Sequence, residues 1–152
     1  CYTTLLTSVG RTVMLVVFRN PKDTVVSYYH FMNTNPVLPN AKSWDSFFTD
    51  FMEGEVAWGS YFDHALAWEK LMDNPNILMV TYEQMKETLG VEKQVQGPPP
   101  FSSKHNDGHY GEVGDWKNHL SEAQSKQMDE EFEKQLAHTK LGAKLKYDIY
   151  CK

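Results

Sequence analysis

An arginine stands where an apolar segment ends and a helix signal begins. Val13 to Phe18 is an unbroken apolar run, Arg19 follows it, and Asn20 and Pro21 are typical of an N-cap and a first helical residue. Ligands of parallel α/β sheets bind beyond the carboxyl ends of the strands, where a helix N-terminus offers N–H groups and a positive dipole. Arg19 adds a fork-shaped cation, and Ser27 lies two turns into the helix. Together they indicate a phosphate clamp.

A purely structural interpretation of the same residues stays open. Arg19 could close the edge of a sheet by pairing with a carboxylate, and Ser27 could be a solvated residue on the helix surface. Arginines at strand ends are common, so these residues alone favour the structural interpretation. The decision between the two depends on the surrounding sequence.

The elements that must position these residues alternate between strands and helices. Short β-branched runs predict buried strands, and apolar residues spaced three and four apart predict helices. Ser121 and Gln124 form a capping box before the last long helix. This order predicts an α/β fold with a parallel sheet. The predicted strands are 12–18 and 76–80, and the predicted helices are 21–33, 44–52, 59–72, 82–88 and 121–136. Residues 90–116 show no convincing periodicity.

Composition limits the class of protein. The chain has 152 residues, 41% of them hydrophobic, and a net charge of -5. One domain is expected, and the acidic balance argues against non-specific nucleic-acid binding. The longest apolar run has six residues, too short for a membrane span. The two cysteines, Cys1 and Cys151, predict no disulfide framework. A cytoplasmic protein is expected.

Several separate segments resemble the cytosolic sulfotransferases. They are "RNPKDTVVSYYHF" (19–31), "SWDSFFTDFMEGEVAWGSYFDHALAWEK" (43–70), "ILMVTYEQMKE" (77–87) and "GEVGDWK" (111–117). The final "LGAKLKYDIYCK" (141–152) is similar to the family-6 branch. The resemblance implies a P-loop-like fold with a central parallel sheet. It also implies transfer of a sulfuryl group from 3′-phosphoadenosine-5′-phosphosulfate (PAPS) to a hydroxyl or amine of a small apolar acceptor, without a metal.

The resemblance also assigns roles to individual residues. It implies that Arg19 and Ser27 hold the 3′-phosphate of PAPS, and that Gly111 belongs to the same nucleotide site. Tyr82 would lie against the adenine, and Phe31 would line the acceptor pocket. Aromatic side chains suit both the flat adenine and a flat apolar acceptor. As alternatives, Tyr82 could be a core tyrosine at a strand end, and Phe31 could serve ordinary packing.

The chain departs from the family pattern at two places. In the family, the glycine that corresponds to Gly111 is normally preceded by Arg-Lys. In this chain the pair is His109-Tyr110, so the phosphate clamp loses two cations. The family's short dimer segment begins at a lysine that matches Lys117, continues with Thr-Val, and ends in glutamate. Here those positions are Ser121, Glu122 and Lys126, which argues against the family's dimer.

The family's phosphosulfate loop and its general-base histidine would both precede residue 1. Residues 1–11 contain neither, and none of the six histidines stands in the family's catalytic context. We therefore expect residues 1–152 to form a single partial domain, the C-terminal half of a sulfotransferase. No catalytic residue is assigned, and the chain alone is expected to be inactive.

Other functions remain as alternatives. The chain could be a non-catalytic relative that binds a nucleotide or a partner. A nucleotide kinase would also use a phosphate site in an α/β fold, but the chain has no Gly-Lys-Ser/Thr loop. His105, Asp107 and His109 could be a metal cluster, but polar glycine-rich segments produce such runs by chance and no further ligand pair stands nearby.

Overall fold

A three-stranded sheet forms one end of the molecule. The structure is a computed structural model that describes residues 2–8, 11–95 and 112–152, with side chains described for 13–88 and 112–152. The strands are β1 (Tyr2–Ser8), β2 (Arg11–Phe18) and β3 (Ile77–Thr81), in the order β1-β2-β3. β2 and β3 are parallel, with Val16 opposite Met79. This confirms that the two predicted strands are adjacent and parallel in an α/β fold.

β1 was not predicted from the sequence. It pairs antiparallel with β2, with Tyr2 opposite Val17 and Ser8 opposite Arg11. The segment "YTTLLTS" lacks the strict alternation or the long apolar run by which strands are recognised. Pairing with β2 supplies its backbone hydrogen bonds, and this contact is visible only in the fold.

Three helices connect the two parallel strands: α1 (Pro21–Thr34), α2 (Trp44–Glu53) and α3 (Tyr61–Glu69). Asn20 caps α1 as expected, because its side chain accepts the N–H of Asp23. Ser43 caps α2 in the same way, and Gly54 ends it in the left-handed conformation. α3 is shorter than the predicted 59–72, since Ser60 is its N-cap and residues 70–73 form turns.

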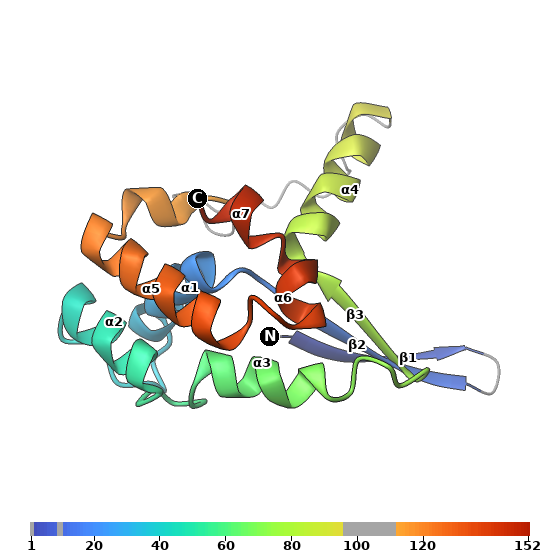
Figure 1. Ribbon diagram of the computed structural model, residues 1–152, viewed down its shortest axis with the longest axis horizontal. Helices are drawn as coiled ribbons and strands as arrows, with labels where there is room; N and C mark the ends of the chain where they lie inside the picture. Colours follow the sequence, from blue (N-terminus) through green and yellow to red (C-terminus); the bar gives the residue numbers. More distant parts are fainter. Residues whose placement is uncertain (1, 9–10, 96–111) are drawn as a thin grey trace.

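The second half of the chain is helical. It contains α4 (Tyr82–Val95), a 3-10 helix η1 (Asp115–Asn118), α5 (Glu122–Gln135), α6 (Lys140–Leu145) and α7 (Tyr147–Tyr150). The capping box of Ser121 and Gln124 is present. α4 continues beyond the predicted 82–88 and points away from the rest of the molecule (Figure 1). Of the aperiodic residues 90–116, residues 96–111 lie outside the described part.

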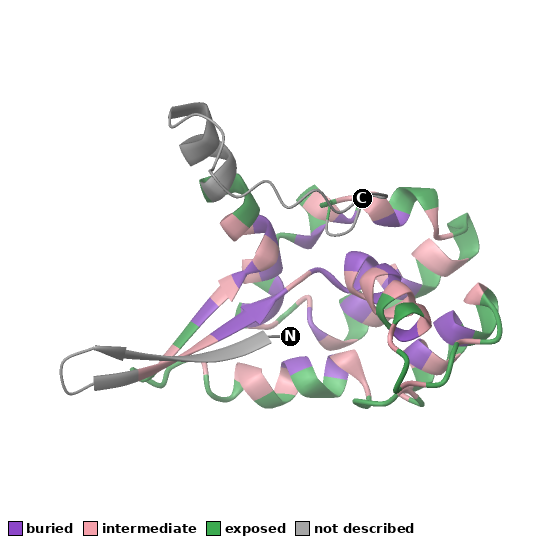
Figure 2. Ribbon diagram, turned by 180° about the vertical axis from the view of Figure 1, so that it is seen from behind, coloured by how far each residue is buried: buried purple, intermediate pink, exposed green. Residues whose placement is uncertain are grey.

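The core lies where the carboxyl ends of β2 and β3 meet α1. Figure 2 shows buried residues at the ends of these strands and along the helices that surround them. Phe18, Val25 and Leu136 are fully enclosed and come from a strand, α1 and the end of α5. Among the described residues, no helix is long and apolar enough to cross a membrane.

Candidate functional site

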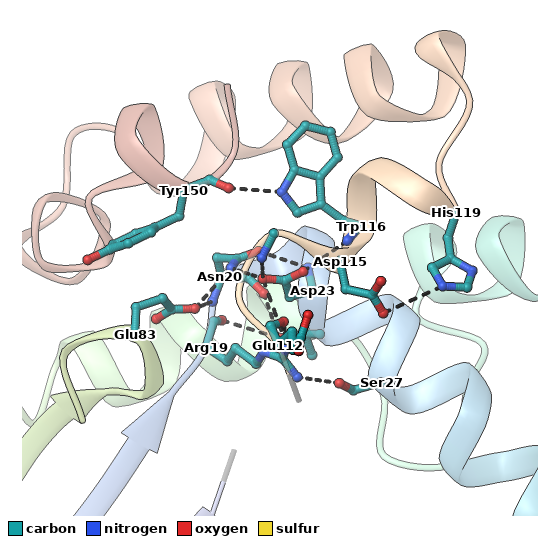
Figure 3. Close-up of polar contacts among 12 residues, drawn as sticks. Arg19, Asn20, Asp23, Ser27, Glu83, Glu112, Asp115, Trp116, His119 and Tyr150 are labelled. Atoms are coloured by element: carbon teal, nitrogen blue, oxygen red, sulfur yellow. Dashed lines mark hydrogen bonds and ion pairs between the residues drawn. The ribbon is translucent and has the colours of Figure 1, made fainter. Parts of the chain in front are cut away.

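Arg19 and Ser27, the two predicted phosphate ligands, are in direct contact. Arg19 follows β2 and its guanidinium reaches along α1, so that Nη1 donates a hydrogen bond to Ser27 Oγ. Nη2 donates to the backbone carbonyl of Glu112 at 2.7 Å (Figure 3). The strand end and the helix are consecutive in the sequence, so this pair is positioned by one strand–helix unit.

Tyr82, the predicted adenine contact, lies against the same guanidinium. Its ring centroid is 4.7 Å from Arg19 Cζ, a cation–π distance. Tyr82 reaches this place because it begins α4 directly after β3, which is parallel to β2. Residues 19 and 82 therefore follow neighbouring strands at the same edge of the sheet. The family resemblance implied the role of Tyr82, and the parallel pairing of β2 and β3 brings its ring to Arg19.

The Nε–H of Arg19 is a donor that the described part of the chain leaves unused. Its Nε is buried and lacks a hydrogen-bond partner among the described residues. The side chain is 15% exposed, and Asp23 Oδ2 lies 3.9 Å from Nη2. A guanidinium with a spare donor at a sheet edge fits an anion such as a phosphate.

The N-terminus of α1 differs from the expectation of free N–H groups. The Asn20 backbone N–H donates to Glu83 Oε1 at 2.9 Å, and the Asp23 N–H donates to Asn20 Oδ1 at 2.8 Å. Pro21 has no N–H. The protein's own polar side chains thus cap the helix end, and Asn20, Asp23 and Glu83 are all buried. An anion here would depend on the Arg19 and Ser27 side chains rather than on these amides.

Residues 112–116 complete one side of this site. Besides the Glu112 carbonyl, the N–H groups of Gly114 and Trp116 point into it and donate to the Asp23 carboxylate at 2.8 and 3.1 Å. Gly114 has φ of +89°, a left-handed conformation that favours glycine. Gly111, predicted as a nucleotide contact, lies outside the described residues, as does the His109-Tyr110 pair.

Phe31 belongs to an exposed aromatic group next to Ser27. It lies one turn further along α1 and is 46% exposed. The ring of Trp58, itself 64% exposed, is 5.9 Å from Phe31 and 5.3 Å from Tyr28. No sequence pattern identified Trp58, because this residue lies between α2 and α3, outside any periodic segment. The two exposed rings form an apolar surface beside the polar clamp.

Two ionisable groups near the site keep their neutral forms. Burial, with the nearby Glu83 carboxylate, raises the pKa of Tyr61 well above its ordinary value. Tyr61 therefore remains protonated and donates its O–H to the Arg19 carbonyl at 2.8 Å. Burial, with the neighbouring His119, lowers the pKa of His30 despite the opposite effect of Asp115. Neither group is positioned as a catalytic base by these contacts.

No metal cluster occurs in the part of the chain that the structure describes. The run His105, Asp107 and His109 lies outside that part. The described site is thus a cation, a hydroxyl and an aromatic ring at a sheet edge, with an exposed aromatic surface beside it. This combination suits an anion attached to a flat ring.

The comparisons define the class of protein. Residues 5–97 match the sulfotransferase domain family, and the chain belongs to that family. It is 56% identical over 167 residues to sulfotransferase 6B1 of Danio rerio and 44% identical over 171 residues to that of Homo sapiens. These alignments cover 91% and 93% of this chain but 56% of each relative. The chain therefore spans about half the length of the curated relatives it matches, which agree with the family-6 resemblance.

Solved structures have the same fold. Mouse sulfotransferase SULT7A1, complexed with PAP, superposes with a TM-score of 0.70 at 28% identity, covering 87% of this chain and 61% of that one. Retinol dehydratase, in complex with androsterone and the inactive cofactor PAP, superposes with a TM-score of 0.60 at 19% identity, covering 83% and 48%. The second similarity supports the fold alone.

Proposed function

We propose that this chain binds the nucleotide of PAPS and serves the transfer of its sulfuryl group to a hydroxyl or amine of a small apolar acceptor. The observation that carries the proposal is the contact of Arg19 with both Ser27 and the ring of Tyr82. Membership of the sulfotransferase family supports the kind of reaction. The PAP complex of the 28% identical SULT7A1 supports the nucleotide.

Each residue of the clamp has a distinct part in this proposal. The 3′-phosphate accepts hydrogen bonds from the Arg19 guanidinium and the Ser27 hydroxyl, which already face each other. Arg19 Nη2 donates to the carbonyl of Glu112, the residue after Gly111, and this contact supports our proposal that Gly111 takes part in binding the nucleotide. The adenine stacks against Tyr82.

The acceptor would lie on the aromatic surface of Phe31 and Trp58. Both rings are exposed and close to each other, and they adjoin Ser27 through α1. In the reaction, an acceptor oxygen or nitrogen forms a bond to sulfur while the bond from sulfur to the bridging phosphate oxygen breaks. The acceptor proton leaves to a base, and adenosine 3′,5′-bisphosphate is released. We assign no base among the residues of this chain.

We also propose that the 152-residue polypeptide alone is a partial domain without turnover. It spans 56% of the length of its 6B1 relatives. Sulfuryl transfer needs a base and cations around the leaving phosphate, and the clamp described here offers one arginine. A charge-assisted hydrogen bond contributes about 1.5–3 kcal/mol, while association costs about 4–15 kcal/mol. We expect adenosine 3′,5′-bisphosphate to bind in the high-micromolar to millimolar range.

Ligand-observed NMR titration with adenosine 3′,5′-bisphosphate tests the proposed function. Binding should weaken with salt and be lost in Arg19→Ala. Arg11→Ala is the matched control, since it removes the same charge at the opposite end of β2 and should leave binding unchanged. Tight binding that is indifferent to Arg19 would show that the site is misplaced, and no binding at all would refute the nucleotide site.

Turnover is tested separately. Purified chain is incubated with PAPS and a panel of phenols, sterols and amines. We expect no sulfated product, and clear turnover that Arg19→Ala abolishes would overturn the proposal of an inactive partial domain.

We propose further that the protein does not use the family's dimer segment. Ser121 is engaged in the capping box of α5, and Lys126 is 79% exposed and 3.7 Å from Glu130. The acid Glu122 is likewise exposed, so this surface is charged rather than apolar. Sedimentation velocity should give a monomer, and a dimer dissociated by Glu122→Arg would contradict the proposal.

We place the site of action in the cytoplasm. Cys151 is a free, buried thiol, which is compatible with a reducing compartment. Fractionation of cells expressing the protein tests this location, and recovery in the secreted fraction would contradict it.

A further inference from the structure

The Asp23 carboxylate connects two segments that are far apart in the sequence. Asp23 is 1% exposed and belongs to the first turn of α1. Its Oδ2 accepts hydrogen bonds from the Gly114 N–H at 2.8 Å and from Asn20 Nδ2 at 2.8 Å. Its Oδ1 accepts the Trp116 N–H at 3.1 Å. One buried carboxylate thus anchors the backbone of residues 114–116 to the start of α1.

The same contacts lead back to Arg19. Asp23 Oδ2 is 3.9 Å from Arg19 Nη2, and this Nη2 donates to the Glu112 carbonyl. The path from Arg19 to Glu112, along the backbone to Gly114, and through Asp23 to Arg19 is therefore closed (Figure 3). Closed networks of this kind restrict the position of every member. The position of residues 112–116 and the direction of the Arg19 guanidinium depend on each other.

We propose that Asp23 is a positioning residue of the anion site, which holds residues 112–116 against Arg19 and so orients the guanidinium toward a bound phosphate. The inference rests on the proposed function, since it concerns the same site. It adds that an acid which does not touch the nucleotide strengthens nucleotide binding. Both Asp23 oxygens accept from backbone and amide donors, so the Ser27 hydroxyl and the Arg19 guanidinium are the groups that meet the anion.

The geometry explains why a carboxylate is needed rather than an amide. Both oxygens of Asp23 accept from N–H donors. In Asp23→Asn, one oxygen becomes an NH₂ group that faces a donor whichever way the amide is turned. At least one anchor of residues 114–116 is then lost, and the negative charge beside Arg19 disappears. Asn is nearly the same size, so the change introduces no large cavity.

The experiment compares Asp23→Asn with Asp63→Asn. Asp63 is a matched control, because it occupies the same position in the first turn of α3, where the Ser60 side chain accepts its N–H, but its side chain is exposed. Binding of adenosine 3′,5′-bisphosphate is measured by NMR titration, and the Gly114, Trp116 and Arg19 Nε–H resonances are followed. We expect Asp23→Asn to shift these resonances and to weaken binding by about tenfold, within the usual range of coupling between sites. Asp63→Asn should change neither.

The outcomes separate this inference from the proposed function. If the unsubstituted chain does not bind the nucleotide, the proposed function fails. If it binds, Arg19→Ala abolishes binding and Asp23→Asn binds equally well, the function stands and the positioning role is wrong. If circular dichroism shows that the Asp23→Asn variant does not fold, amide hydrogen exchange in the unsubstituted chain tests the positioning role instead. Saturating nucleotide should then slow exchange at Gly114 and Trp116, and unchanged exchange would overturn the inference.

Discussion

Replacing Lys22 with methionine should destabilise the fold, because this lysine joins three parts of the chain from inside the protein. Its side chain is 1% exposed, and its Nζ lies 2.7 Å from each of Ser125 Oγ, the Cys151 carbonyl and Asp129 Oδ1. Nζ also lies 4.3 Å from the ring of Trp116. The ammonium thus connects the start of α1 to α5 and to the C-terminal residues.

The expected magnitude follows from what each partner loses. Removing one member of a buried ion pair costs about 3–5 kcal/mol, mostly because the other charge is left uncompensated. Here Asp129 is 35% exposed and still accepts the Tyr147 hydroxyl at 2.7 Å, so water and Tyr147 compensate it partly. Methionine keeps much of the apolar stem against Trp116. We therefore expect the free energy of unfolding to fall by about 3 kcal/mol, the lower end of that range. For a chain of this size, this corresponds to a decrease in Tm of roughly 6–12 °C.

Urea and thermal unfolding followed by circular dichroism measure this loss. Lys126→Met is the matched control, since it makes the same chemical change on α5 in a side chain that is 79% exposed and paired with Glu130. A surface pair of this kind contributes about 0–1 kcal/mol. Equal effects of the two substitutions, or a stable Lys22→Met variant, would refute the argument that the buried ammonium holds these segments together.

Two further predictions concern stability. Because burial and His119 lower the pKa of His30, the unfolded chain binds this proton more readily, so stability should fall as the pH drops through about 6.5. His30→Gln should flatten the decrease in Tm between about pH 7 and pH 5, and an unchanged pH profile would count against this contribution. A Cβ on Gly142 would lie 1.8 Å from the Leu136 carbonyl oxygen, so Gly142→Ala should force a backbone shift and cost more than about 2 kcal/mol in urea unfolding. A wild-type midpoint for that variant would show that the turn between α5 and α6 can move without cost.

Local sequence signals determined the strand–helix unit at residues 12–34. The apolar run predicts a buried strand, and Asn20 with Pro21 predicts the helix start, because both signals act between near neighbours in the chain. The same holds for the capping box at Ser121. The spacing of Arg19 and Ser27 placed both on one unit, and their contact follows from that unit.

Only the tertiary structure decided which distant residues meet this unit. Nothing in the local pattern distinguishes Lys22 and Asp23, buried and bonded to residues 114–151, from solvated charges in a first helical turn. Tyr82 reaches Arg19 because β2 and β3 are parallel neighbours, and Trp58 joins Phe31 through the packing of the chain after α2. Periodicity reports which face of an element is apolar, whereas these contacts depend on how elements far apart in sequence pack against one another.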